Sequence, residues 1–260
     1  MRPKRSKTNQ WLIIATMVTT AAAMPGMALA EELVALDATN NDLYRVDTDH
    51  MGSPVLLGNI SVGTDLSGIV AAGTDRLYTF DRDANSIITV SALDASVLSV
   101  VTLDRDSLVR PRGFDASPDG VLYGVFGGME LRTVAPDTGQ TTLVTNISGA
   151  GASMIEGLAF SPDGTPFLVG AGAGYRSDTL YTLDVQTGAL SLVGSLNVPD
   201  IDCLTYGLDG YLYGTDSLGG RQADLYRIDP ATAQVSIVGN TAVYEVNGIA
   251  SLSESVTLVE

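Results

Sequence analysis

Cysteine and histidine are almost absent from this sequence of 260 residues, in which Cys203 and His50 are the only examples. A single cysteine excludes an internal disulfide, so packing and strand pairing must hold the fold together. The same scarcity excludes zinc sites built from histidine and cysteine. A serine hydrolase of the familiar kind needs a histidine base and a Gly-x-Ser-x-Gly turn, and the sequence contains no such turn. We expect His50 to be a solvated turn residue and Cys203 a small buried filler.

Lysine and tryptophan occur only near the N-terminus, as Lys4, Lys7 and Trp11. Beyond residue 30 every basic residue is an arginine, and residues 31–260 carry a formal charge of 10 − 30 = −20. A surface this acidic repels nucleic acid phosphates and anionic lipid headgroups. We therefore expect neither nucleic acid nor a membrane surface as a partner.

Residues 1–30 have the pattern of a secretory signal peptide. Four basic residues within the first seven positions precede an apolar run of 14 residues, 11–24, and the small residues Ala28 and Ala30 suit a signal peptidase. The run is shorter than the roughly 20 residues that a membrane-spanning helix needs, which argues against a retained anchor. The sequence predicts cleavage after Ala30 and a soluble periplasmic or secreted product, with residues 31–260 as one domain and no membrane insertion after cleavage.

A repeat of about 45 residues organises the rest of the chain. Successive copies begin 45, 44, 46 and 45 residues apart, at Gly68, Gly113, Gly157, Cys203 and Gly248. Within each copy, short apolar runs alternate with turns such as Ser117-Pro-Asp-Gly120, in which proline and glycine suit the turn dihedrals. Runs such as Leu225-Tyr-Arg-Ile-Asp229 alternate apolar and polar side chains, which is typical of half-buried strands.

Four antiparallel strands in each repeat predict an all-β propeller. Residues 33–60 supply only three strands of a blade, and residues 246–252 can supply the missing inner strand and so close the ring. This arrangement gives five four-stranded blades, with the N- and C-terminal strands sharing one of them. The apolar segment Val256–Glu260 falls where another strand is due, so six blades is the alternative.

The repeat reads Gly157-Leu-Ala-Phe-Ser-Pro-Asp-Gly164 and Leu225-Tyr-Arg-Ile-Asp-Pro-Ala-Thr232 at its clearest. In these residues the chain resembles bacterial exported propellers, among them the quinoprotein-like repeats and the gluconolactonase and senescence-marker family. Quinoprotein repeats dock their blades with a tryptophan, so the absence of tryptophan after Trp11 implies that pyrroloquinoline quinone is not bound. The lactonase family holds a divalent metal with Glu, Asp and Asn side chains at the starts of inner strands.

One polar residue precedes each repeat start, and in a propeller these positions converge on the axis. The five residues are Ser67, Arg112, Glu156, Asp202 and Asn247. Glu156, Asp202 and Asn247 offer oxygen donors from consecutive blades, which suits Ca²⁺, and the lactonase resemblance supports this assignment. Ser67 and Arg112 are predicted to bind the ligand, and Arg112 either pairs with Glu156 or holds a substrate carboxylate beside the metal. Alternatively, the ring only bonds loop backbone and channel water.

These observations favour an exported, non-enzymatic binding or surface-associated propeller, which we expect to be monomeric. Its partner is a protein, a carbohydrate or a small molecule, and the sequence does not choose between them. The alternative function is a calcium-dependent hydrolase or lactonase, because a metal that activates water needs no histidine. Two long loops are candidates for a partner surface. Arg176 follows the first loop, residues 170–174, and Arg221 lies in the second, residues 217–222.

Overall fold

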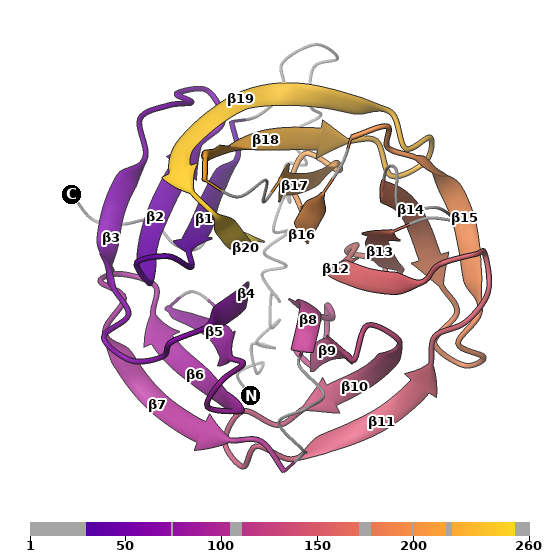
Figure 1. Ribbon diagram of the computed structural model, residues 1–260, viewed down its shortest axis with the longest axis horizontal. Helices are drawn as coiled ribbons and strands as arrows, with labels where there is room; N and C mark the ends of the chain where they lie inside the picture. Colours follow the sequence, from indigo (N-terminus) through magenta and orange to yellow (C-terminus); the bar gives the residue numbers. More distant parts are fainter. Residues whose placement is uncertain are drawn as a thin grey trace, which may run out of the picture.

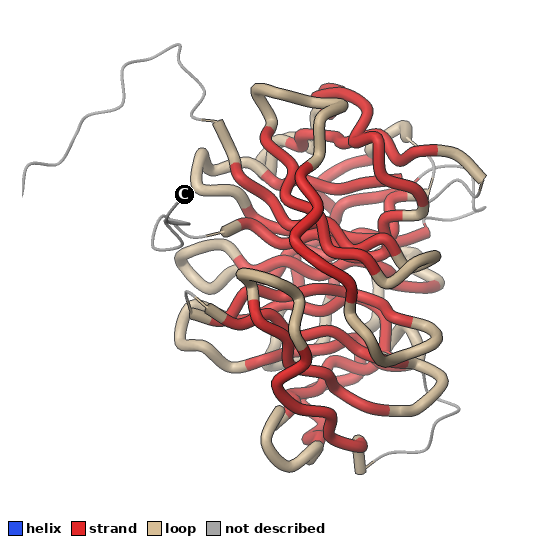
Figure 2. The backbone as a smooth tube through the Cα atoms, turned by 90° about the vertical axis from the view of Figure 1, so that its left-hand side faces the viewer, coloured by secondary structure: helices blue, strands red, loops and turns tan. Residues whose placement is uncertain are grey.

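The computed structural model describes residues 30–73, 75–104, 111–171, 178–198, 200–216 and 220–252. These residues form five four-stranded antiparallel sheets arranged in a ring (Figure 1). Strands joined by turns and loops account for the whole described part of the chain (Figure 2). No helix in this part is long and apolar enough to span a membrane. The chain is therefore a five-bladed β-propeller, which confirms the first of the two predicted blade counts.

In each blade, the first strand named lies at the axis and the fourth lies at the outer edge. Blade 1 combines strands from both ends of the chain. It consists of β20 (Val246–Ser251), β1 (Glu32–Asp37), β2 (Asp42–Asp47) and β3 (Val55–Asn59). Blade 2 consists of β4 (Leu66–Ala72), β5 (Arg76–Asp81), β6 (Ser86–Ser91) and β7 (Val97–Thr102). Blade 3 consists of β8 (Pro111–Ala116), β9 (Leu122–Phe126), β10 (Glu130–Val134) and β11 (Thr141–Asn146).

The last two blades follow the same order. Blade 4 consists of β12 (Met154–Phe160), β13 (Pro166–Ala171), β14 (Asp178–Leu183) and β15 (Leu190–Ser195). Blade 5 consists of β16 (Ile201–Tyr206), β17 (Leu212–Asp216), β18 (Gln222–Ile228) and β19 (Val235–Tyr244). The inner strands β4, β8, β12, β16 and β20 surround the central channel (Figure 1).

The ring closes as the sequence predicts, by antiparallel pairing of β20 with β1. Glu31, which is almost fully buried, reinforces this closure with both carboxylate oxygens. Its Oε1 accepts a hydrogen bond from the backbone N of Asp209 at 2.7 Å, and its Oε2 accepts one from Oγ of Ser251 at 3.3 Å. Blade 5 is thereby tied to both ends of the chain. The segment Val256–Glu260 lies outside the described residues.

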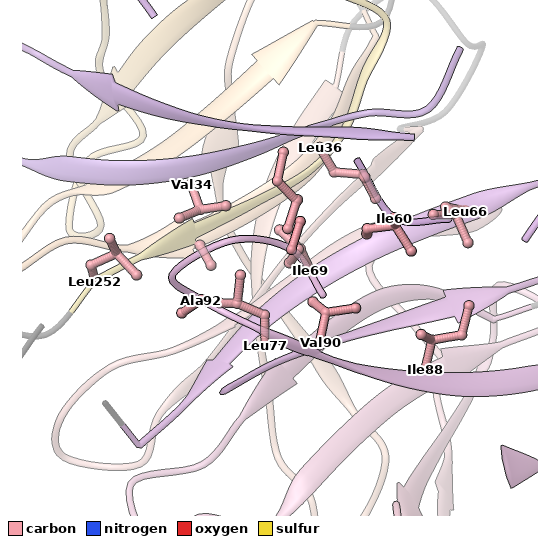
Figure 3. Close-up of a cluster of buried hydrophobic side chains, with 13 residues drawn as sticks. Val34, Leu36, Ile60, Leu66, Ile69, Leu77, Ile88, Val90, Ala92 and Leu252 are labelled. Carbon is pink, nitrogen blue, oxygen red and sulfur yellow. The ribbon is translucent and has the colours of Figure 1, made fainter. Parts of the chain in front are cut away.

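Five apolar clusters hold the blades together, one between each pair of neighbours. The alternation along β1 shows how they form: Leu33 and Ala35 join the cluster with blade 5, and Val34 and Leu36 join the one with blade 2. Figure 3 shows this second cluster, where side chains of blade 1 meet those of blade 2. Both faces of the inner strands are buried between neighbouring blades, which explains why the inner runs of the repeat are continuously apolar.

The glycines at the repeat starts let adjacent inner strands approach one another. A Cβ on Gly113 would lie 2.7 Å from the carbonyl carbon of Gly157, and one on Gly248 would lie 2.7 Å from that of Gly68. Cys203 takes the glycine position in blade 5, where it is buried with its Sγ 2.8 Å from Oγ1 of Thr215. Burial raises the pKa of its thiol to about 12, which confirms a buried filler in place of a reactive thiol.

Candidate functional site

The structure brings the five predicted polar residues together at one end of the channel. They line a cavity of about 110 Å³, hereafter the central cavity, which among the described residues is lined by Ser67, Arg82, Arg112, Glu156, Asp202 and Asn247. Next to it lies a space of about 10 Å³ that the same five polar residues line together with the repeat-start residues and Ile69, Phe114, Leu158, Leu204 and Ile249. The polar ring therefore faces both spaces, and the apolar side chains line only the smaller one.

A β-bulge directs three of these side chains. Ile155 pairs with Gly170 and Gly157 pairs with Val169, so Glu156 between them has no partner opposite it on β13. Asp202 in β16 and Asn247 in β20 occupy the same kind of position. A bulge frees one residue from the ladder and re-aims its side chain. The sequence interpretation had placed these residues just before the inner strands, whereas they lie within them because each strand continues past its bulge.

Blades 2 and 3 have irregular pairing at the same level. In β4 the register shifts between Ser67 and Val70, so the buried Ser67 lies directly before the bulge. In β8 the shift falls between Pro111 and Phe114 and includes Arg112. All five blades therefore have an irregularity at this level, and in blades 1, 3, 4 and 5 it includes the polar residue itself.

Arg82 is a site residue that the sequence analysis missed. It follows β5 in the turn to β6, and this turn lies at the same end of the blade as the start of β4 because the strands are antiparallel. Its Nε lies 3.1 Å from Oδ2 of Asp65, and its Nη2 lies 2.5 Å from Oδ1 of the same residue. This two-point ion pair fixes the guanidinium at the cavity. The equivalent positions in the other four repeats carry no basic residue, so the sequence offered no signal for it.

The pKa of Glu156, on the acidic side of the central cavity, is shifted by burial and by neighbouring charges. Burial raises the pKa of Glu156 to about 7, and the negative charge of Asp202 acts in the same direction. Arg112 opposes this shift, since its Nη1 lies 3.2 Å from Oε1 of Glu156. The pairing of Arg112 with Glu156 was one of the two alternatives for that arginine, and the structure shows it.

A second carboxylate supports the strand that carries Asp202. Asp178 is buried at the start of β14, and its Oδ2 accepts a hydrogen bond from the backbone N of Ile201 at 2.5 Å. Burial raises the pKa of Asp178 to about 6, with a further contribution from the charges of Asp202 and Asp200. The charges of Asp202 and Asp200 therefore act on both Glu156 and Asp178.

A metal ion in the central cavity would need Asn247 as its third protein ligand. Among the described residues, no three or more His, Cys, Asp and Glu side chains come together in a group that could hold a metal. A calcium ion would take Glu156, Asp202 and the amide oxygen of Asn247, completed by water. The contact between Arg112 and Glu156 works against this arrangement, because it places a cation on one of the three donors. The roles of these residues as metal ligands stay a prediction.

Two other residues singled out in the sequence, His50 and Arg221, do not line the central cavity. His50 is an exposed turn residue whose Nδ1 is 2.7 Å from Oδ2 of Asp47, as expected of a solvated histidine. Arg221 contacts Asp216 closely and lies 3.5 Å from Oδ2 of Asp224, which fixes the start of β18. Gln222 already belongs to β18, so the second long loop is shorter than predicted. Residues 172–177 and 217–219, with Arg176 among them, lie outside the described residues.

Solved structures share this fold at low sequence identity. A protein of unknown function from Bacteroides caccae matches 86% of this chain and 100% of its own at 12% identity, with a TM-score of 0.53. The PQQ-bound aldose sugar dehydrogenase from Streptomyces coelicolor matches 85% of this chain and 82% of its own at 16% identity, with a TM-score of 0.52. A chain of the nidogen/laminin complex matches 85% and 84% at 17% identity, with a TM-score of 0.52. At these identities the likeness concerns the fold alone.

Sequence comparison identifies the repeat itself. No curated protein matches the sequence significantly. A family model described as a repeat of unknown function, DUF6923, matches residues 112–250, which are 139 of the 260 residues. The matched segment contains the bulged residues of blades 3, 4 and 5 and Asn247 of blade 1. Because the match covers more than half of the sequence, the chain belongs to the DUF6923 repeat family.

Proposed function

We propose that the protein is an exported, non-enzymatic binding propeller that holds a small polar molecule in the central cavity. One observation carries this proposal: six polar side chains, contributed by all five blades, converge on a recess of about 110 Å³. Ligand sites are concave and orient their ligands with a few convergent polar groups. The cavity is too small for a protein segment of any length, which favours a small molecule over the protein and carbohydrate partners.

The lining supplies both kinds of hydrogen-bonding group. The guanidinium of Arg112 has five N–H donors, and its contact with Glu156 engages Nη1. Asn247 brings a carbonyl acceptor and an amide donor, and Ser67 a hydroxyl. Because the bulges set these side chains on strands and not on long loops, the site is largely formed before the ligand arrives. Preorganisation of this kind lowers the entropy cost of binding.

Export is supported by the sequence of residues 1–30, which has the three parts of a signal peptide. Residues 1–29 lie outside the described part of the chain, so the support comes from the sequence. Intact-mass measurement of the protein recovered from its native host tests this part of the proposal. A mass beginning at Glu31 is expected, and a cell-associated product that retains Met1 would contradict it.

Calcium-dependent hydrolysis is the second candidate, and the closeness of Glu156 to Asp202 favours it. The charge of Asp202 raises the pKa of Glu156, and a divalent cation between them would remove that repulsion. Calorimetric titration of calcium into the wild type and an Asp202→Ala, Asn247→Ala double variant tests the metal site. Heats that disappear in the variant, together with calcium-dependent cleavage of lactones by the wild type, would establish this function in place of simple binding.

A thermal-shift screen of small polar molecules tests the binding function directly. Any stabilising compound should act less on Arg112→Gln and Asp202→Asn, which remove one charge each and keep a polar side chain. Arg45→Gln is a matched control, since Arg45 lies on β2, does not line the central cavity and pairs with Glu32 at 3.7 Å. Compounds that stabilise all three variants as well as the wild type would place binding elsewhere and contradict the proposal.

A further inference from the structure

A groove of about 630 Å³, hereafter the rim groove, lies between the outer parts of the neighbouring blades 4 and 5 (Figure 1). Its floor contains Leu196 and Ala233, which are 3% and 4% exposed and belong to the apolar cluster between these blades. The blades meet closely here, since a Cβ on Gly194 would lie 2.9 Å from that of Ala233. None of the described residues that line the rim groove also lines the central cavity, so the two spaces are distinct.

One wall of the rim groove is an apolar platform from blade 5. Tyr226 of β18 lies directly opposite Ile237 of β19, so both side chains share one face of the blade. Val235 lies two residues before Ile237 and belongs to the same face. The hydroxyl of Tyr226 donates a hydrogen bond to Oδ2 of Asp216 at 3.1 Å, which fixes the ring. Ile237 is 63% exposed, so part of this apolar surface is open to solvent.

Uncharged hydrogen-bonding groups border the platform. The turn between β18 and β19 brings Thr232 and Gln234 to the groove, and the segment that follows β15 brings Asn197. The hydroxyl of Thr232 accepts a hydrogen bond from the backbone N of Gln234 at 3.3 Å and keeps its own hydrogen as a donor. The exposed side-chain amide of Gln234 has two donors and one acceptor. These groups can bond a ligand that lies on the platform.

The rim groove differs from the rest of the chain in its lack of charge. Residues 31–260 contain 30 acidic and 10 basic residues, yet none of the ten described residues that line the groove is charged. The outermost strands of all five blades, β3, β7, β11, β15 and β19, contain no charged residue either. A charged ligand would find no opposite charge in the groove, and an anion would also be repelled by the protein as a whole. An uncharged ligand fits best.

We propose that the rim groove binds a neutral oligosaccharide segment of a polysaccharide chain. A pyranose ring has an apolar face of C–H groups, which can pack on Tyr226 and Ile237. Its uncharged hydroxyls both donate and accept, so they match Asn197, Thr232 and Gln234. The volume of the groove lies within the roughly 300–1,000 Å³ of small-molecule sites, and its open side leaves room for a longer chain to continue. This binding function is additional to that of the central cavity and does not depend on it.

An extended apolar peptide fits the rim groove less well. Peptides bind to sheets by adding a strand to an exposed edge, through hydrogen bonds of the main chain. In β15 a bulge leaves Val193 without a partner on β14, and the pairing of β19 with β18 has two irregularities. Bulges twist and interrupt the edge that an added strand needs. Recognition by side chains, which suits a sugar, is therefore favoured over strand addition.

Native affinity electrophoresis tests the proposal. The acidic protein migrates towards the anode, and an uncharged polysaccharide held in the gel slows it by binding. Soluble starch, hydroxyethylcellulose, galactomannan and dextran are the four probes, and an unrelated acidic protein corrects for sieving. At least one probe should retard the wild type, and the dissociation constant follows from the mobility at several polysaccharide concentrations.

Two variants and two matched controls locate the binding site. Ile237→Ala removes apolar surface and should weaken binding by about tenfold. Gln234→Ala removes an amide and should weaken it by about three- to tenfold. Leu192→Ala is the control for the first, because Leu192 is also 63% exposed but does not line the groove. Gln140→Ala is the control for the second, because Gln140 occupies the same position in the equivalent turn of blade 3. Both controls should bind as the wild type does.

Retardation that both groove variants weaken and both controls keep would support the proposal. No retardation by any of the four polysaccharides, or retardation that the groove variants leave unchanged, would overturn it. A hexapeptide of alternating valine and threonine that binds with the same dependence on the variants, without polysaccharide binding, would replace the sugar by a peptide. Arg112→Gln should leave polysaccharide binding unchanged, because Arg112 lines only the central cavity of the two spaces. Failure of this proposal therefore leaves the function of the central cavity standing, and the reverse also holds.

Discussion

Ending the chain after Glu245 should unfold the whole ring and not only one blade. The truncation removes β20, which is the innermost strand of blade 1 and pairs with β1 along its length. It also removes Val246, Ile249 and Leu252, all at most 5% exposed. These side chains belong to two of the interblade clusters, so both neighbours of blade 1 lose part of their contact surface.

The expected loss of stability is comparable to the total stability of a domain. Burial of one valine, isoleucine or leucine side chain contributes about 1.5–3 kcal/mol, so the three large side chains contribute about 5–9 kcal/mol. This is an upper value, since an unfolded chain already buries some apolar surface. The free energy of unfolding of a natural domain is about 5–15 kcal/mol. Loss of the strand pairing adds to the deficit, so little cooperative structure should remain.

Urea unfolding followed by circular dichroism measures this effect. A chain that ends after Leu252 is the matched control, because it lacks only residues 253–260 and keeps β20. The control should unfold at the midpoint of the full-length protein, whereas the chain that ends at Glu245 should show no cooperative transition. An unchanged midpoint in the shorter chain would refute the reasoning that closure by β20 stabilises the ring.

The remaining predictions concern single residues. Burial raises the pKa of Asp115 to about 7, so its contribution to stability should fall as the pH rises from about 4 to 7. In thermal unfolding, Asp115→Asn should therefore be more stable than the wild type at pH 8 but not at pH 4. In urea unfolding, Gly113→Ala should destabilise the protein far more than Gly120→Ala. A Cβ on Gly113 would clash with the backbone of blade 4, whereas a Cβ on Gly120 has open space and costs only the roughly 1–2 kcal/mol strain of a positive φ. Cys203 should react with a thiol reagent only in denaturant, and fast reaction of the native protein would contradict its burial. Ile249→Ala should cost about 2–5 kcal/mol of unfolding free energy, whereas Ile237→Ala, on a side chain 63% exposed, should change it by about 0.5 kcal/mol or less.

The repeat made the architecture predictable. Glycines recur at four of the five repeat starts because the inner strands approach too closely for a Cβ, and this steric requirement leaves a periodic mark in the sequence. The same spacing locates the polar residue beside each start. The closure of the ring followed from counting strands at the two ends of the chain, since residues 33–60 lack one.

Features that occur once escaped the sequence analysis. Arg82 has no counterpart after the second strands of blades 1 and 3, where Ala38 and Gly127 stand, so no periodic signal marks it. The bulges were also invisible, because an extra residue in an inner strand leaves the repeat length unchanged. The raised pKa of Glu156 depends on which side chains become its neighbours across the channel. Closure of the ring brings these side chains together, and no local sequence pattern indicates that they are close.

The bulges have a consequence for how such a protein can change during evolution. A residue held outside the ladder is under little selection from strand pairing, so substitutions there are tolerated by the fold. Four such positions, Arg112, Glu156, Asp202 and Asn247, meet at one recess. New recognition properties can therefore arise one codon at a time, without an intermediate that fails to fold. For an engineer, the same four codons define a compact combinatorial library on a fixed framework.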